Sequence, residues 1–463
     1  MKYRYSCALG LLLMAGCATS IPTLAPNAGV EAPSSWARSV PGGSAPLAQW
    51  WRVFGDPLLV QLVEDAAHAN TDIAVARANL RAARAARDEA AAALWPSLSL
   101  GAQAQRSRAS GGASDRNNFQ AGLDAGWELD LFGANAHAAR AQESLVQASA
   151  ATLAQTQVSI AAEVALAYLD LRGAQARIAV ARENLANQQE TLQISQWRAQ
   201  AGLANAVEVE QATTAVEQTR ASLPTLAKAE AQAAHALGVL TGRTPQALLS
   251  TLAAAAPLPQ AKAGVEVNLP AAVLRERADV LAAEARLRAA AERVGAADAA
   301  RKPRIALDAS VGWSAGTLGN LGSIAAARSL LVSLTQPLFD AGRLRAQLTA
   351  REAEFDAAQA SYRASVLGAL QEVEDALVAL SASREREAAL ERALESARTA
   401  ALLASQRHAS GLIDFQTVLE TQRTLLNVQD SVTSAQADVA AAHVRLYKAL
   451  GGGWSAAGVE SAS

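Results

Sequence analysis

The sequence predicts a mostly α-helical protein with a small β part, built as a tandem repeat with very long coiled-coil helices and four β-strands. Two Ala-rich stretches of equal length contain no proline, and a shorter helical stretch follows each. Glycines bound these stretches at a constant offset of 209 residues: Gly133 and Gly342, Gly202 and Gly411, Gly242 and Gly451. Two pairs of segments ahead of the long stretches alternate apolar and polar residues. We therefore interpret the chain as a tandem duplication.

The two long stretches, 133–202 and 342–411, are expected to be continuous helices. Each is rich in strong helix formers and contains one internal glycine, Gly173 or Gly368. At 1.5 Å per residue, such a helix is about 100 Å long. Because tertiary packing supplies most of the stability of a helix, these two need neighbours along their whole length.

The shorter stretches supply a packing seam. Small and apolar residues recur there at alternating steps of three and four, which is a strong coiled-coil pattern. In the second repeat they are Val418, Thr421, Leu425, Val428, Val432, Ala435, Val439, Ala442, Leu446 and Ala449. The first repeat has an equivalent series from Val209 to Leu240, interrupted by Glu230, and Pro224 predicts a kink in that helix.

A further helix is expected at about residues 57–94, after the aromatic residues Trp50, Trp51 and Phe54. Its segment 72–96 matches 279–303 at an offset of 207, so the duplication begins before the long helices. We place the repeats at 57–242 and 269–454. Residues 243–268 are rich in Pro and Ala and are expected to cross over in the equatorial region of the helices, and 455–463 form a C-terminal tail.

The period changes from helical to two after Pro96, which predicts strands at about 97–107 and 119–130. The second repeat predicts strands at about 304–314 and 329–337. The clearest strand has two distinct faces. Its apolar face has Phe119, Ala121, Leu123, Ala125, Trp127 and Leu129, and its polar face has Gln120, Gly122, Asp124, Gly126, Glu128 and Asp130.

Strands of about ten residues with one apolar and one polar face are typical of outer-membrane barrels. An ordinary sheet on a soluble core has the same pattern, but a chain with 4% aromatic residues offers little core to cover. Asp124, Glu128 and Asp130 indicate a wet lumen, and Trp127 and Trp313 are candidates for an interfacial girdle.

Four strands cannot close a membrane barrel, because lipid does not tolerate open sheet edges and about eight strands are the minimum. The chain is therefore expected to form an oligomer, and strand geometry alone allows two, three or four copies. The Gly- and Ser-rich loops within each strand pair, at 109–118 and 314–329, are the expected extracellular ends.

The N-terminus predicts an exported lipoprotein. Residues 1–16 have Lys2 and Arg4 ahead of a short apolar run that ends at Gly16, followed by Cys17. This pattern is a bacterial signal peptide with a lipobox-like end, and Cys17 is the candidate lipidation site. A plain signal peptide with a chance cysteine is the alternative. Residues 17–56, rich in Pro, Gly and Ser between 22 and 46, are read as a lipidated tether.

Composition and motifs exclude several function classes. Without Lys2 and Arg4, the 41 basic residues become 39 against 43 acidic ones, a net charge of −4 that does not fit nucleic-acid binding. The five histidines are scattered, without metal-binding spacing, and there is no P-loop, dinucleotide fingerprint or nucleophile elbow. We expect no metal site, no cofactor and no enzyme activity.

Three motifs resemble the outer-membrane efflux protein family, the TolC-like proteins, and in particular its NodT-type lipoprotein subgroup. The first is the C-terminal run 446–454, Leu-Tyr-Lys-Ala-Leu-Gly-Gly-Gly-Trp. The second is Leu237–Gly242 followed by Pro245, and the third is Leu269-Pro270 with Leu274–Val280. The family usually has Pro at the position of Ala278 and aromatic residues at those of Arg301 and Lys302, so this chain departs from the pattern at these positions.

The resemblance implies a homotrimer with a 12-stranded β-barrel in the outer membrane, continued by a 12-helix tunnel across the periplasm. It implies a passive exit duct for drugs or other small toxic compounds in a tripartite efflux pump. The expected partners are a periplasmic adaptor (membrane fusion protein), an inner-membrane pump of the resistance-nodulation-division (RND) class and outer-membrane lipid.

The periplasmic end is expected where the chain turns back, at Gly202-Leu203 and Gly411-Leu412. These tips are the candidate contacts for adaptor or pump. Just beyond the second turn, Glu420 and Arg423 resemble the charged pair that closes the pore in family members. Their alternative role is an ordinary helix-surface pair at i and i+3.

Two other functions stay open on the sequence alone. A non-conducting envelope lipoprotein could use its coiled coils as a spacer, although amphipathic strands would then have no purpose. An exit duct for type I protein secretion or for metal efflux would have the same architecture.

Overall fold

The computed structural model describes residues 22, 29–31, 33–37, 47–108, 116–261, 270–321 and 326–454. These residues divide into two compact units, each assembled from segments that are distant in sequence. Residues of 78–151 and 281–365 make up most of the first unit, and residues of 31–77, 152–280 and 366–454 belong to the second. No helix in the described part of the chain is long and apolar enough to cross a membrane.

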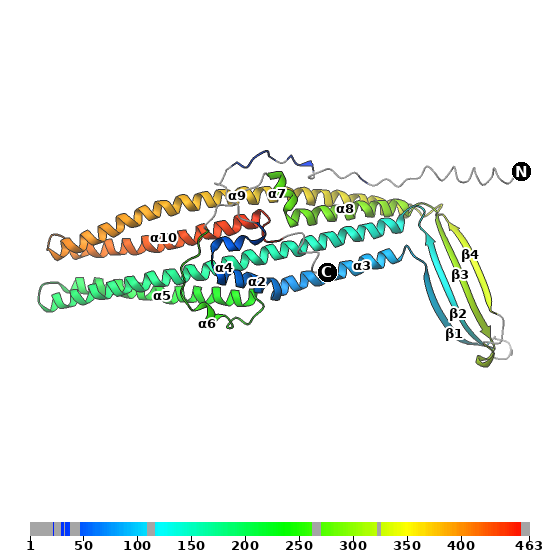
Figure 1. The fold of residues 1–463 in the computed structure, drawn as a ribbon, viewed down its shortest axis with the longest axis horizontal. Coiled ribbons are helices and arrows are strands. Elements are labelled where there is room, and N and C mark those ends of the chain that lie inside the picture. Colours follow the sequence, from blue (N-terminus) through cyan, green and yellow to red (C-terminus); the bar gives the residue numbers. More distant parts are fainter. Residues whose placement is uncertain are drawn as a thin grey trace. The chain divides into compact units, whose positions relative to one another are not determined.

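The first unit contains an antiparallel sheet of four strands in the order β1-β2-β3-β4 (Figure 1). The strands are β1 Ser97–Ser107, β2 Arg116–Leu129, β3 Arg304–Ala315 and β4 Ala327–Thr335. A short 3₁₀-helix, η3 Leu318–Asn320, follows β3. The four predicted strands are therefore present. β2 begins three residues earlier than expected, and β4 ends before Pro337, which has no N–H to continue the ladder.

The predicted long helices are also present, as α4 Ala134–Gln200 and α9 Arg343–Ala409, with 67 residues each. Both continue through their internal glycines. Gly173 packs closely, because a Cβ there would lie 3.4 Å from Cβ of Ala437, whereas the position of Gly368 opens to free space. At 1.5 Å per residue each helix is about 100 Å long.

The return helices α5 Ala206–Leu240 and α10 Phe415–Ala449 have 35 residues each. On α10 the predicted seam is buried at Val418, Val432, Ala435, Ala442 and Leu446, among others. α5 runs through Pro224 as one helix, and Glu230 on its seam accepts a hydrogen bond from the Gln175 side chain at 3.0 Å.

The helix expected at 57–94 is two helices, α2 Pro57–Ala69 and α3 Thr71–Ala92, so that prediction was wrong. Asn70 causes the break, because its backbone is extended, with φ −65° and ψ 134°, and its side chain caps α3. Its Oδ1 accepts from the N–H groups of Asp72 and Ile73, and its Nδ2 donates to the carbonyl of Leu240, the last residue of α5.

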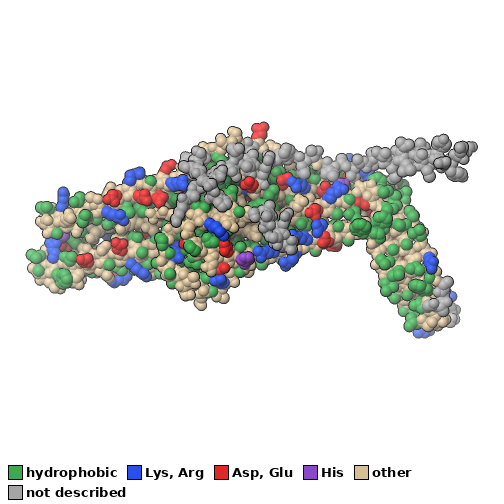
Figure 2. All heavy atoms as spheres, in the orientation of Figure 1, with side chains coloured by type: hydrophobic (Ala, Val, Ile, Leu, Met, Phe, Trp, Pro, Cys, Tyr) green, Lys and Arg blue, Asp and Glu red, His purple; other side chains and the backbone are tan. Residues whose placement is uncertain are grey.

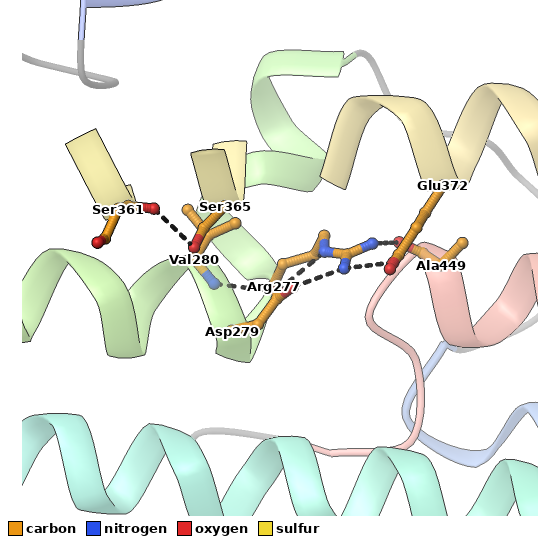
Figure 3. Close-up of polar contacts among 7 residues, drawn as sticks. All are labelled: Arg277, Asp279, Val280, Ser361, Ser365, Glu372 and Ala449. Carbon is orange, nitrogen blue, oxygen red and sulfur yellow. Dashed lines mark hydrogen bonds and ion pairs between the residues drawn. The ribbon is translucent and has the colours of Figure 1, made fainter. Parts of the chain in front are cut away.

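The second repeat has the same junction, built around Arg277 between α7 Pro270–Glu276 and α8 Ala278–Ala299 (Figure 3). Arg277 occupies the position equivalent to Asn70 and donates to the carbonyl of Ala449, the last residue of α10, at 2.7 Å. The guanidinium also pairs with Asp279 and Glu372, with N–O distances of 2.6 Å to each. In both repeats, therefore, one polar side chain joins the start of a helix to the end of its return helix.

Aromatic residues form the core beside this junction. The 3₁₀-helix η2 Leu47–Phe54 buries Trp50 completely, and its ring stacks on Tyr447 with centroids 5.3 Å apart. Asp56 then caps α2 and accepts a 2.6 Å hydrogen bond from the hydroxyl of Tyr168 on α4. The crossover contributes α6 Leu249–Leu252, whose Leu252 is buried.

Replacing Arg277 with Met should destabilise the fold by about 2 kcal/mol, since Asp279 and the Ala449 carbonyl lose a charged donor in a buried place. Urea denaturation of the purified protein measures this loss. Arg288→Met is the matched control, because Arg288 pairs with Glu284 on an exposed helix face and should contribute less than about 0.5 kcal/mol. Equal effects of the two substitutions would contradict the role of Arg277.

His443 on α10 is a buried histidine next to a cation. Its side chain is 3% exposed, and Nη2 of Arg384 lies 3.1 Å from its Nε2. Burial and, to a smaller extent, the positive charge of Arg384 lower the pKa of His443 to about 4. The imidazole is thus neutral in the folded protein at neutral pH.

Between pH 6.5 and pH 4 the unfolded chain binds a proton at His443 that the folded chain does not, so stability should fall as the pH drops through this window. The loss at pH 5 should be roughly 2 kcal/mol per protomer. Urea midpoints at pH 7 and pH 5 test this, and His443→Leu should reduce the difference. His235→Leu, at an exposed position of α5, should leave the difference unchanged.

Candidate functional site

The strand register separates the sheet into two chemically distinct faces, because directly opposite residues of an antiparallel pair lie on the same face. The register pairs Leu100 with Leu123 and Leu123 with Val311. The apolar face thus consists of Leu98, Leu100, Ala102 and Ala104 of β1, Phe119 to Leu129 at alternate positions of β2, Ile305 to Ala315 at alternate positions of β3, and Leu330, Val332 and Leu334 of β4.

The opposite face is polar and acidic. Its rows include Ser99, Asp124, Ser310 and Ser329, which lie side by side across all four strands. Glu128 and Asp308 belong to the same face. Asp130 was expected there as well, but this prediction was wrong. It follows β2, and its Oδ2 accepts a 2.7 Å hydrogen bond from the N–H of Ala136 at the start of α4.

The sheet is hollowed on its polar face. A cavity of about 430 Å³ is lined mostly by residues of that face, among them Gln103, Gln120 and Asp124. Small residues form one row across the sheet: Gly101, Gly122, Gly312 and Ala327. Neighbouring strands approach closely there, because a Cβ on Gly122 would lie 3.0 Å from the carbonyl oxygen of Val311. The polar face is therefore the concave one, as the inner wall of a barrel requires.

The apolar face has no cover within one chain. Leu100 is 77% exposed on β1, and Leu330 is 73% exposed on β4. Figure 2 shows apolar side chains over much of the visible face of the strands. Trp127 lies near the helix end of the strands and donates from Nε1 to the carbonyl of Leu94, while Trp313 lies near the loop end. Such an apolar band with an aromatic residue toward each end fits a lipid-facing surface.

The sheet has two open edges. β1 pairs only with β2, and β4 pairs only with β3, in the described sheet. The outer N–H and C=O groups of both strands therefore have no ladder partner, which lipid does not tolerate. Pairing of β4 with β1 of another copy removes both edges at once.

The hairpin tips are built alike in the two repeats. Gly202 and Gly411 have φ values of +72° and +74°, which favour glycine, and they end α4 and α9 as predicted. The following Leu203 and Leu412 donate from their N–H groups to the carbonyls of Arg198 and Arg407. This bond pattern is the Schellman motif of helix C-termini. Asn205 and Asp414 then cap α5 and α10.

The tip leucines point away from the protein, since Leu203 is 71% exposed and Leu412 is 72% exposed. The first hairpin also exposes Ile194, Trp197 and Val207 close to its tip. An apolar tip of this kind offers a docking surface for another protein.

One contact that the sequence did not reveal joins the two tips. Nη1 of Arg198 lies 2.7 Å from Nε2 of His408, and this nitrogen accepts a hydrogen bond from the guanidinium. Its Nδ1 then donates to the carbonyl of Ile413 at 3.2 Å, and its ring packs on Phe415 with centroids 5.5 Å apart. The first long helix is thus connected to the second at its end.

Further polar contacts join α4 to α10 above the tips. Arg177 makes a bidentate ion pair with Asp430, with N–O distances of 2.6 and 3.0 Å. These hydrogen bonds raise the pKa of Arg177 above its usual value. Nδ2 of Asn184 donates to Oε1 of Gln429 at 2.7 Å. The return helix of the second repeat is therefore held against the long helix of the first.

Glu420 and Arg423 lie close to these contacts but take no part in them. Both are exposed, and neither has a polar partner among the described residues. The i,i+3 pair Glu217 and Arg220 on α5, in contrast, does form an ion pair. Arg423 lines a cleft of about 250 Å³ together with residues of α4 and α5, including Gln188 and Gln218.

Two other sequence predictions concern the lipidation of Cys17 and the absence of a metal site. Cys17 lies outside the described residues, so its lipidation stays a prediction. In the described ranges, no group of three or more His, Cys, Asp or Glu side chains is placed to hold a metal ion.

Comparison with known proteins identifies the family. The outer membrane efflux protein family matches residues 62–243 and again residues 269–452. The chain belongs to the outer membrane efflux protein family. The two matches fall on either side of the crossover segment.

Relatives match over nearly their full length. The pyoverdine export outer membrane protein OpmQ of Pseudomonas putida is 32% identical, over 98% of this chain and 98% of its own. The toluene efflux pump outer membrane protein TtgF of Pseudomonas putida is 33% identical, over 88% of this chain and 85% of its own. Among solved structures, the outer-membrane channel OprN superposes with a TM-score of 0.85 at 34% identity, covering 94% of this chain and 99% of that one.

Proposed function

We propose that this protein is the outer-membrane exit channel of a tripartite efflux pump of the RND class. The observation that carries the proposal is the sheet, which has an uncovered apolar face, a hollowed acidic face and two open edges. Such a sheet suits a wall between lipid and water. Continuous helices of 67 residues extend this wall toward the periplasm. The channel conducts compounds passively and carries out no chemical reaction on them.

Three copies supply twelve strands and close one barrel, in keeping with the trimers implied for this family. The helices α4 and α9 with their return helices then form the walls of a tunnel. The mass of the complex in mild detergent tests this assembly. A dimer or a tetramer would contradict the trimer and leave the strand assignment unchanged.

The hairpin tips are the proposed contacts with the periplasmic adaptor and the inner-membrane pump. Gly202 and Gly411 fix the turns, and Leu203 and Leu412 offer exposed apolar side chains at equivalent places. Three chains therefore provide six similar docking points. Together with the exposed Trp197 near the first tip, these leucines are the proposed apolar anchors for a partner protein.

The choice of exported compounds is made by another component of the pump. OpmQ is named for pyoverdine export and TtgF for toluene efflux, yet both are about equally similar to this chain. The two names therefore refer to different compounds, pyoverdine and toluene. The exit channel is therefore a general route, and the inner-membrane pump selects the substrate.

Glu420 and Arg423 are proposed as the periplasmic gate. Neither charge has a polar partner among the described residues, so both are available to neighbouring subunits around the tunnel axis. Replacing both with Ala should raise single-channel conductance in planar bilayers and admit large antibiotics, because links between subunits are lost. Glu217→Ala with Arg220→Ala is the matched control, since that pair is satisfied within α5.

Unchanged conductance in a correctly assembled double variant would contradict the gate. A wild-type protein that inserts but never conducts, even when its tips are destabilised, would instead favour a coiled-coil spacer over an exit channel.

Cys17 is proposed to carry the lipid that anchors the N-terminus to the inner leaflet of the outer membrane. Mass spectrometry of the mature protein should find acyl chains on Cys17, and Cys17→Ser should remove them. The barrel should still insert in this variant, because the apolar face of the strands is a separate membrane signal. A mature N-terminus without acyl chains would disprove the assignment.

A further inference from the structure

The helix end of the sheet carries large apolar side chains that the described chain leaves uncovered. Leu338 and Phe339, here called the apolar pair, follow β4 and are 93% and 89% exposed. Trp95 lies two residues before the start of β1 and is 74% exposed. Because β1 and β4 are the two edge strands, these residues lie at opposite margins of one sheet. Large apolar side chains exposed in this way mark an interaction surface.

The turn between β4 and α9 holds the apolar pair in its exposed position. Asp340 accepts hydrogen bonds from the N–H groups of Gly342 and Leu344, at 3.0 and 2.9 Å. Ala341 has a φ of 54°, and it is the one residue other than glycine with a positive φ in the described part of the chain. This conformation is unfavourable for a residue with a Cβ. The turn is therefore a defined feature of the fold, and the direction of the apolar pair is fixed with it.

The first repeat has an equivalent junction with a neighbouring strand on each side. Leu131 and Phe132 lie there between β2 and α4, and β2 pairs with both β1 and β3. Phe132 is only partly exposed, in contrast to Phe339. β4 has a neighbour on one side only in the described sheet. We therefore expect the cover of the apolar pair to come from the strand that pairs with the free edge of β4.

Within the chain, a residue after the end of one strand contacts a residue before the start of its neighbour. Nε2 of Gln336, just after β4, donates to the carbonyl of Arg301, just before β3, at 3.2 Å. The same arrangement on the free edge of β4 places the apolar pair beside the residues that precede β1 of the partner subunit. Trp95 is one of these residues.

Closure of the barrel predicts which residues become level. Across one sheet, Ala327 at the start of β4 is aligned with Gly101, six residues before the end of β1 at Ser107. In a barrel with strands tilted by about 45°, four strand-to-strand steps shift the register by about six residues. This shift places Ala327 opposite Ser107 of the partner subunit. At the helix end, the same shift brings Phe339 level with Trp95 of the partner subunit.

Hydrocarbon is a poor cover at this level of the protein. Gln336 contacts Arg301 here, and Arg301 and Lys302 both form ion pairs with Asp298, with N–O distances of 3.2 and 3.9 Å. Charged groups of this kind lie in water or among lipid headgroups, because burying them in hydrocarbon is costly. An apolar protein surface covers the apolar pair better, and an indole ring supplies a large one.

We propose that Leu338 and Phe339 of each subunit pack against Trp95 of the partner subunit, at the periplasmic rim of the barrel. The contact rests on the trimer of the proposed function, and it is complete only where two subunits meet. It joins the start of α9 in one subunit to the end of α3 in the next. The subunits are thus fastened at the boundary between strands and helices, in addition to the pairing of β4 with β1.

Cysteine crosslinking in the full trimer tests the contact. Trp95→Cys and Phe339→Cys in one chain should give covalent dimers and trimers in denaturing gels after mild oxidation or treatment with a short bismaleimide, because each seam then has a cysteine from each side. The two single substitutions should give none, which controls for Cys7 and Cys17. Trp95→Cys with Leu131→Cys is the matched control, since Leu131 is 57% exposed but follows a strand whose neighbours belong to its own chain.

Alanine substitutions test the energy of the contact. Phe339→Ala and Trp95→Ala should each raise the rate of trimer dissociation in detergent roughly tenfold or more, because large aromatic side chains dominate the energy of an interface. The double variant should add little to either change, since one substitution already removes the contact. Leu131→Ala should dissociate at nearly the wild-type rate, and Trp95→Phe should recover most of the stability that Trp95→Ala loses.

Two results would overturn the proposal. One is an assembled double-cysteine trimer that forms no covalent oligomers, with Leu338→Cys as the second position if Phe339→Cys does not assemble. The other is additive loss in the two alanine variants, which is expected if lipid headgroups cover the two side chains separately.

Conductance of the same samples tests the channel independently. A conducting trimer without the crosslink contradicts only the rim contact. A crosslinked trimer that never conducts contradicts only the channel.

Discussion

The need to pair the outer backbone N–H and C=O groups of β1 and β4 constrains the structure more than any other requirement. A sheet with an apolar outer face belongs in lipid, yet lipid does not tolerate the open edges of four strands. Each chain must therefore share its edges with other copies. Once the sheets close in a ring, the helices that begin where the strands end must form a ring as well. Membrane insertion, assembly and the tunnel wall all follow from the edge hydrogen bonds.

The duplication solves a second problem, because each 67-residue helix needs partners that a single return helix of 35 residues cannot supply. A second, shorter helix covers the remainder in each repeat, and the ends of the two meet at Asn70 or Arg277. The two junctions are equivalent in position but not in chemistry. The neutral amide of Asn70 donates to one carbonyl and caps the helix that follows it. The buried guanidinium of Arg277 also forms ion pairs with Asp279 and Glu372.

The elements with a strong period could be predicted from sequence. The long helices, the return seams and the four strands follow from periods of 3.6, 3.5 and 2, and the positive φ values of Gly202 and Gly411 follow from residue type. Contacts between helices that are distant in the sequence left no periodic pattern from which they could be predicted. The ion pair of Arg177 with Asp430 depends on how two helices are rotated against each other. Residues 116–118 were also predicted as loop, because their side chains are all polar. They nevertheless belong to β2, since the backbone hydrogen bonds of a strand do not require apolar side chains.

The junction at Asn70 and Leu240 has an evolutionary consequence. Two helix ends meet there in place of one continuous helix, so the chain can gain or lose whole heptads in α5 and the adjoining half of α4 while the segments ahead of the strands keep their length. The periplasmic reach of the duct is then a trait that selection can tune independently of the membrane barrel. Lineages with wider or narrower cell envelopes could adjust one part of the protein in register with their adaptors and leave the other unaltered.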